Sequence, residues 1–169
     1  ATNPLFESFG NAKTSRNNNS SRFGKWLQIL FNDKFGLMGA KITHYLLEKS
    51  RVTFQGENER NFHIFYQMAA KIDSIGDMAQ YNYLNQSGCY AIDGVDDGED
   101  FGFTDTAFKN LGFAPGTVNT IYKSLEGILL LGNVVFVEKD DDEGGDAGAS
   151  IPEGSASHIA LQKACDILK

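Results

Sequence analysis

Two apolar runs of strand length, separated by a short polar stretch, constrain the fold of this chain most strongly. Residues 26–31 and 40–47 are rich in large aliphatic and aromatic side chains, and residues 32–36 between them are polar and contain glycine. Runs of this composition, bounded by turn residues, are typical of strands. The polar stretch is longer than a tight turn, so the sequence predicts an antiparallel pair joined by a loop. A short extended piece is expected at residues 52–54, before Gly56.

The remainder of the chain carries mainly helical patterns. Residues 1–9 resemble the end of a helix that stops at Gly10, and residues 59–72 place their apolar side chains on one helical face. A brief strand is expected at residues 134–137, and a last helix is expected to begin near Ser157. The predicted fold class is α+β, with an antiparallel strand pair packed against a mostly helical part.

Two more helices are predicted in the second half of the chain. The first is expected to begin at Thr104, because its hydroxyl can cap free helix amides and because Phe103 and Phe108 have the spacing of a hydrophobic staple. Gly112 should end this helix. Pro115 suits the first turn of the second helix. The buried stripe of that second helix is expected to consist of Val118, Ile121, Leu125, Ile128 and Leu129.

The length and net charge of the chain limit the class of protein to which it can belong. The chain has 169 residues, enough for one compact domain, and its net charge of −7 argues against a general nucleic-acid binder, because phosphate binding needs a basic stripe. No signal peptide and no membrane-length apolar run are visible, so we expect a cytoplasmic protein without membrane contact. The chain begins with Ala1 and ends at Lys169 within a helical pattern, and a fragment of a longer protein is therefore expected.

Several familiar sites are excluded by their missing residues. The sequence contains no glycine-rich phosphate loop followed by Lys and Ser or Thr. Residues 93–98 are similar to a calcium loop, but Val95 stands at a ligand position and Thr104 stands where a Glu is needed. The histidines lie in unrelated segments without metal spacing, and each is interpreted as a structural or surface residue: His44, His63 and His158.

A polar loop at residues 11–25 is the remaining candidate site. The loop is dense in amide and hydroxyl side chains and carries four cations. Such a loop could bind phosphate through its amides, its hydroxyls and a cation. From composition alone, a polar and flexible connection without chemistry is the simpler interpretation.

Acidic clusters offer a function of a different class. One cluster runs from residue 93 to residue 105, and a second lies in residues 138–155, which are Gly-rich, aperiodic and expected to form a mobile surface loop. The alternative function is therefore a non-enzymatic interaction module whose acidic loops bind a basic partner.

The polar loop also resembles a known family. Residues 9–25 closely resemble switch I of myosins, and further segments resemble the myosin motor domain in the same order along the chain. These further segments are residues 45–52, 59–67, 83–89 and 127–134. Together the matching segments span nearly the whole chain, and they are specific to myosins rather than common to all P-loop proteins.

The resemblance implies roles for residues of the loop. The asparagine matching Asn17 contacts the nucleotide phosphates, and the serine matching Ser21 ligates Mg²⁺. The serine matching Ser20 lies against the γ-phosphate and the attacking water. The arginine matching Arg22 pairs with a glutamate of switch II. Ser20 and Arg22 are thus the expected catalytic residues, and Ser21 is the expected metal ligand.

The resemblance also implies where the chain lies in an actin-based motor. Residues 1–25 match the switch I region, residues 26–54 match two strands of the central (transducer) sheet of a P-loop-type motor, and residues 55–137 match the helical part of the upper 50 kDa subdomain. Residues 138–156 would form the acidic surface loop, and residues 157–169 would start a further helix. The expected substrate is Mg-ATP, and the expected partners are F-actin and the rest of the myosin heavy chain, in the cytoskeleton. The family's Walker loop and switch II do not occur in this sequence, so we expect the chain to be inactive on its own.

Overall fold

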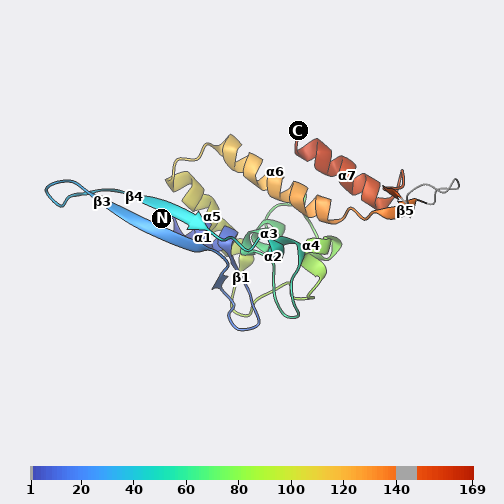
Figure 1. Ribbon diagram of the computed structural model, residues 1–169, viewed down its shortest axis with the longest axis horizontal. Coiled ribbons are helices and arrows are strands. Elements are labelled where there is room, and N and C mark those ends of the chain that lie inside the picture. The colour runs from blue at the N-terminus through green and yellow to red at the C-terminus, as the bar shows by residue number, and fades with distance from the viewer. Residues whose placement is uncertain (1, 140–147) are drawn as a thin grey trace.

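The computed structural model describes residues 2–139 and 148–169 (Figure 1). Within them the sheets are two-stranded and antiparallel, and most other elements are helical, which confirms the predicted α+β class. The elements, in chain order, are α1 (Asn3–Gly10), β1 (Asn11–Ala12), β2 (Ser20–Ser21), β3 (Gly24–Phe31), β4 (Leu37–Tyr45), α2 (Ser50–Thr53), α3 (His63–Ala69), η1 (Met78–Gln80), α4 (Asn82–Asn85), α5 (Asp97–Asn110), α6 (Pro115–Gly132), β5 (Val137–Lys139), β6 (Gly148–Ser150) and α7 (Ala156–Ile167).

The predicted antiparallel strand pair is confirmed as β3 and β4, with somewhat wider bounds. The pairing runs from Gly24↔Tyr45 to Phe31↔Leu37, with a shift of register next to Phe31. This ribbon projects from the helical part of the molecule (Figure 1). Its large apolar side chains are exposed, including Trp26 at 64% and Leu37 at 71%. Exposed apolar surface on this scale usually marks an interface.

The core is centred on α3. Phe65, Tyr66 and Met68 are buried and pack with Leu84 of α4 and Leu129 of α6. The prediction of a helix over residues 59–72 was therefore right about the buried face.

The same prediction was wrong about the length of the helix, because residues 60 and 61 bind elsewhere. The backbone N–H of Arg60 donates to the carbonyl of Lys13 at 2.9 Å, and that of Asn61 donates to the hydroxyl of Tyr66 at 3.0 Å. Because these two amides bond to Lys13 and to the Tyr66 side chain, both residues lie outside α3.

The two short extended pieces predicted outside the main pair also need correction. Residues 52 and 53 belong to the helical turn α2, where the Arg51 side chain pairs with Glu48 three residues earlier. The brief strand lies at β5, not at residues 134–137, because the backbone amides of Val134 and Val135 bond to Leu131 O and Ser157 Oγ. The central part of the predicted acidic surface loop, residues 140–147, lies outside the described residues.

The prediction that a helix begins at Thr104 was wrong, because α5 begins earlier. Asp96 caps α5 by accepting from the backbone amides of Gly98 and Glu99 at 2.8 and 3.0 Å. Thr104 lies in the middle of α5, fully buried, and its hydroxyl bonds to Ser8 and Gln67. The hydroxyl that was expected to cap a helix therefore joins α5 to α1 and α3.

The predicted end of α5 and start of α6 are confirmed. Gly112 follows α5 with φ +79, a conformation that favours glycine. Pro115 is the first residue of α6. Along the predicted stripe, Val118 and Leu129 are buried, and the other members are half-buried. The last predicted helix is α7, which packs along α6 (Figure 1) and is capped by Ser155. Within the described residues no helix combines the length and apolarity needed to cross a bilayer.

Candidate functional site

The candidate site is the loop of residues 13–19, which β1 and β2 close at its base. The two strands pair antiparallel in the register Asn11↔Ser21 and Ala12↔Ser20. The sequence predicted a loop here and missed the closing pair, because strands of two residues leave no periodic pattern. The pair fixes Ser20 and Ser21 on a regular backbone at the end of the loop.

The amide of Asn17 is oriented by the loop itself. Its Oδ1 accepts a hydrogen bond from the backbone N–H of Asn19 at 2.7 Å. The backbone carbonyl of Asn17 closes a turn by accepting from Thr14 N–H at 2.8 Å. With Oδ1 engaged, the side-chain amino group of this exposed residue has no acceptor among the described residues. Two N–H donors are thus available to an anion.

The hydroxyl of Ser21 donates a hydrogen bond within the chain, whereas the hydroxyl of Ser20 accepts one. Ser21 Oγ donates its hydrogen to Asn11 Oδ1 at 3.0 Å. Ser20 Oγ instead accepts from Arg22 Nη1 at 3.2 Å. A serine hydroxyl has one hydrogen and two lone pairs. Ser21 therefore retains oxygen lone pairs, which hard cations bind, whereas Ser20 retains its hydrogen, which a phosphate oxygen or water can accept.

Arg22 lies against Glu48, a partner that the sequence interpretation did not identify. Its Nε and Nη2 donate to the two carboxylate oxygens of Glu48 at 2.7 and 2.9 Å, a bidentate ion pair. The side chains of Arg22 and Glu48 are 27% and 31% exposed. The expected contact of Arg22 with a glutamate of switch II stays a prediction, because that glutamate is not part of this sequence.

A second ion pair connects Glu48 to the opposite side of the loop. Arg51, nearly buried, donates from Nε to Glu48 at 2.6 Å and from Nη1 to Glu59 at 3.1 Å. Glu59 in turn accepts from the backbone N–H of Ser15 at 3.2 Å. The carboxylates and guanidinium groups thus form a continuous chain from Arg22 to the tip of the loop.

This chain of charges predicts the titration of Glu48. Hydrogen bonding to Arg22, and then to Arg51, lowers the pKa of Glu48 from 4.5 to about 2, against the opposing effect of burial. A carboxyl whose pKa is lower when folded stabilises the fold fully above pH 4.5, and loses this contribution as the pH falls toward 2. We expect ¹³C NMR of a folded protein containing this chain to show Glu48 titrating near pH 2.

Removing the arginines provides the control for that titration. Arg22→Met should raise the pKa of Glu48 toward its ordinary value, and Arg51→Met should raise it less, because the bond to Arg22 has the larger effect. Titration near pH 4.5 in the unaltered protein would contradict the ion pairs described above.

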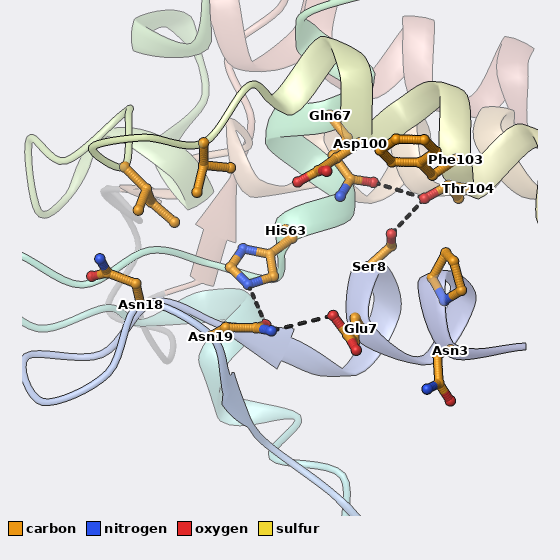
Figure 2. Close-up of a pocket in the computed structure, with 13 residues that line it drawn as sticks. Asn3, Glu7, Ser8, Asn18, Asn19, His63, Gln67, Asp100, Phe103 and Thr104 are labelled. Atoms are coloured by element: carbon orange, nitrogen blue, oxygen red, sulfur yellow. Dashed lines mark hydrogen bonds between the residues drawn. The ribbon is translucent and has the colours of Figure 1, made fainter.

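Asn19 connects the loop to the helices behind it (Figure 2). Its Oδ1 accepts from Asn11 Nδ2 at 2.9 Å and bonds to His63 Nε2 at 3.1 Å, and its Nδ2 donates to Glu7 Oε2 at 3.2 Å. Burial, assisted by the charge of Arg60, lowers the pKa of His63 to about 4. His63 is therefore neutral at neutral pH and donates its Nε2 hydrogen to Asn19. This agrees with its interpretation as a hydrogen-bonded structural residue.

A cavity of about 270 Å³ lies behind the loop, between α1, α3 and α5 (Figure 2). Of the loop residues, only Asn18 and Asn19 line it. The carboxyls of Glu7 and Asp100 also line it, and burial together with the neighbouring Asp97 raises the pKa of Asp100. This acidic lining is unsuited to phosphate, so the cavity is not the place where the loop would bind a nucleotide.

The sequence-predicted residues Asn17, Ser20, Ser21 and Arg22 thus lie at one end of one loop. Sequence reasoning missed Asn11, Asn19 and Glu48, which orient them. For Glu48 a local signal existed, since Arg51 follows at the i,i+3 spacing of helical ion pairs. In residues 2–139 and 148–169, no three His, Cys, Asp or Glu side chains are grouped so that they could hold a metal. A metal at Ser21 would consequently need most of its ligands from outside the described residues.

Comparison with known proteins identifies relatives over the whole chain. The model of the myosin head (motor domain) family matches residues 1–169. Unconventional myosin-Va of Homo sapiens is 47% identical over 149 residues, which are 84% of this chain and 8% of that protein. Myosin-1 of Aspergillus terreus is 49% identical over 92% of this chain and 13% of that protein. Myosin heavy chain IB of Acanthamoeba castellanii is 51% identical over 80% of this chain and 12% of that protein. The chain thus spans only 8 to 13% of the length of these relatives.

Proposed function

The chain belongs to the myosin head (motor domain) family, and on this premise we propose that residues 9–25 contain the switch I loop of an actin-based motor that hydrolyses Mg-ATP. The observation that carries the proposal is the direction of the hydrogen bonds. They leave the amino group of Asn17, the hydroxyl hydrogen of Ser20 and the lone pairs of Ser21 for a ligand. The phosphates of a nucleoside triphosphate accept hydrogen bonds from donors such as the amino group and the hydroxyl hydrogen. The hard cation bound with them takes oxygen ligands such as the Ser21 hydroxyl.

Each residue then has one role in the site. Asn17 donates its amide hydrogens to phosphate oxygens, and Ser21 offers a hydroxyl oxygen to Mg²⁺. The ion, when bound, neutralises charge that develops on the phosphate oxygens. Ser20 donates its hydrogen toward the γ-phosphate and the attacking water, so it positions groups and is not a nucleophile. Catalysis of this kind depends mainly on alignment and charge, for which small polar side chains suffice.

Arg22 is proposed to close the site by pairing with the switch II glutamate. Its bonds to Glu48 use Nε–H and one N–H of Nη2, and its bond to Ser20 uses one N–H of Nη1. A guanidinium carries more donors than these. Arg22 can therefore keep Glu48 as a partner and still bind a second carboxylate through its remaining N–H groups. Closure would exclude water from the bound nucleotide.

The ribbon of β3 and β4 is proposed to belong to the central sheet of the intact motor, with residues 55–137 in the upper 50 kDa part of the actin-binding cleft. The exposed Trp26 and Leu37 support this placement, because neighbouring strands of the rest of the heavy chain would cover them. Arg22 lies two residues before β3, so a movement of the loop would reach the sheet. F-actin, in the cytoplasmic cytoskeleton, is the proposed partner of the intact motor.

The chain by itself is proposed to be inactive. It contains no glycine-rich phosphate loop with its lysine, and phosphate release by the isolated chain above a buffer blank would contradict this. The alternative function as an acidic interaction module receives no specific support, since the family match covers the whole chain.

Ser20→Ala in the intact motor tests the proposed function. We expect ATP affinity to be nearly unchanged and the hydrolysis step to slow by about a hundredfold, the effect typical of losing one positioned transition-state donor. Single-turnover kinetics separate the two steps. Ser15→Ala is the matched control, because in the described part of the chain Ser15 bonds through its backbone N–H and not through its hydroxyl. A higher KM with unchanged kcat would show that Ser20 only binds the nucleotide, and would contradict its proposed role.

A further inference from the structure

The side chain of Asn11 makes two hydrogen bonds that together define the orientation of the loop. Its Oδ1 accepts from Ser21 Oγ at 3.0 Å, and its Nδ2 donates to Asn19 Oδ1 at 2.9 Å. Asn19 in turn holds Oδ1 of Asn17 through its backbone N–H. One buried amide therefore contacts the proposed metal ligand directly and the proposed phosphate ligand through one intermediate.

The backbone of Asn11 is itself fixed from two directions. It lies immediately after α1, where its N–H caps the helix by donating to Glu7 O, and it pairs with Ser21 across β1 and β2. Asn11 is only 5% exposed. Its side chain is thus a rigid acceptor at the point where the hydrogen of Ser21 must go if the Ser21 lone pairs are to face a cation.

We propose that Asn11 is a positioning residue for Mg²⁺, acting through Ser21. The proposal rests on the proposed function, in which Ser21 ligates the ion. A hydroxyl that ligates a cation becomes a stronger hydrogen donor, and an acceptor behind it both fixes its rotation and strengthens it as a ligand. The Oδ1 of Asn11 is that acceptor. Without it, the Ser21 hydroxyl is free to rotate and its hydrogen competes for the space of the metal.

Equilibrium binding of a fluorescent ADP to the intact motor, at stepwise free Mg²⁺, tests the proposal. Asn11→Leu is nearly isosteric and removes both hydrogen bonds. We expect it to raise the half-saturating Mg²⁺ concentration by about 10–100-fold, the usual cost of losing a partner behind a metal ligand. The affinity for ADP in EDTA should fall far less than the affinity in Mg²⁺, because the bond to Asn19 reaches the phosphate ligand Asn17 only indirectly. A merely structural loss would lower both affinities alike. Asn133→Leu is the matched control, since Asn133 also makes two side-chain bonds, far along the chain from the loop.

Further variants separate failure of this proposal from failure of the proposed function. Ser21→Ala should itself raise the Mg²⁺ requirement, and an unchanged requirement would overturn the ligand assignment. If Ser21→Ala has its effect and Asn11→Leu has none, only the positioning role fails. Asn11→Leu added to Ser21→Ala should produce no further change in the Mg²⁺ requirement, because Asn11 acts on the ion through Ser21.

Asn11→Asp keeps the test valid if Asn11→Leu fails to fold. This substitution retains an acceptor for Ser21 and removes the donor to Asn19. Its Mg²⁺ requirement should be no higher than that of the unaltered motor, and a higher requirement would overturn the proposal.

Discussion

Arg22→Glu in the intact motor is expected to leave ATP binding largely in place and to slow hydrolysis by about a hundredfold. Removing one partner of a buried ion pair typically costs ~3–5 kcal/mol. The pair on which the proposed closure depends is that with the switch II glutamate, and for it we take the lower end of that range. A cost of ~3 kcal/mol corresponds to a factor of about a hundred in rate. Quenched-flow measurement of the hydrolysis step and nucleotide titration report the two effects separately.

Charge reversals at the two candidate partners then show which contact matters for hydrolysis. Reversing the switch II glutamate to arginine, together with Arg22→Glu, should restore part of the rate. Combining Arg22→Glu with Glu48→Arg should restore only the ion pair within this chain and leave hydrolysis slow. If Glu48→Arg restored hydrolysis and the reversal of the switch II glutamate did not, Glu48 would be the catalytically relevant partner. That result would contradict the proposed pairing. Lys34→Glu, in the exposed turn between β3 and β4, controls for the change in net charge.

Asp97→Ala is expected to lower the free energy of unfolding by about 3–5 kcal/mol, because it leaves a buried guanidinium without its counter-ion. Arg60 is fully buried and donates to both oxygens of Asp97 at 3.0 and 2.8 Å, and its Cζ lies 3.7 Å from the centre of the Tyr66 ring. Urea denaturation of a folded protein containing this chain measures the loss.

The exposed ion pair between Lys109 and Asp105 provides the control for that measurement. The Lys109 side chain is 73% exposed, and pairs of this kind contribute about 0–1 kcal/mol. Asp105→Ala should therefore change stability little. Similar losses from Asp97→Ala and Asp105→Ala would contradict the assignment of a structural role to the buried pair.

The sequence predicted those elements whose signals are local. The ribbon of β3 and β4 follows from two apolar runs, and the start of α6 follows from Pro115. The start of α5 was wrong because Phe103 and Phe108 have a spacing that also occurs within a helix. The better signal was Asp96 followed by an acidic first turn, which favours a helix N-terminus.

The composition of the candidate site was predictable, but its orientation was not. Asn17, Ser20, Ser21 and Arg22 are close together in sequence, so one resembling segment contains them all. The direction of the Ser21 hydrogen bond depends on Asn11, which local patterns did not single out, and the orientation of Arg22 depends on the more distant Glu48. Glu48 reaches Arg22 across the whole ribbon, 26 residues along the chain. Contacts of this range leave no trace in helical or strand periodicity.

The measurement that tests the account most directly is a change of metal preference at Ser21. In the intact motor, Ser21→Cys replaces the proposed hydroxyl ligand by a thiol, which Mg²⁺ binds poorly and softer divalent ions such as Mn²⁺ accept better. We predict that ATP hydrolysis by Ser21→Cys is lost in Mg²⁺ and partly recovered in Mn²⁺, while Ser15→Cys behaves like the unaltered motor with both ions. The same rate for Ser21→Cys in Mg²⁺ and in Mn²⁺ would contradict the claim that this loop supplies a ligand to the metal of the nucleotide.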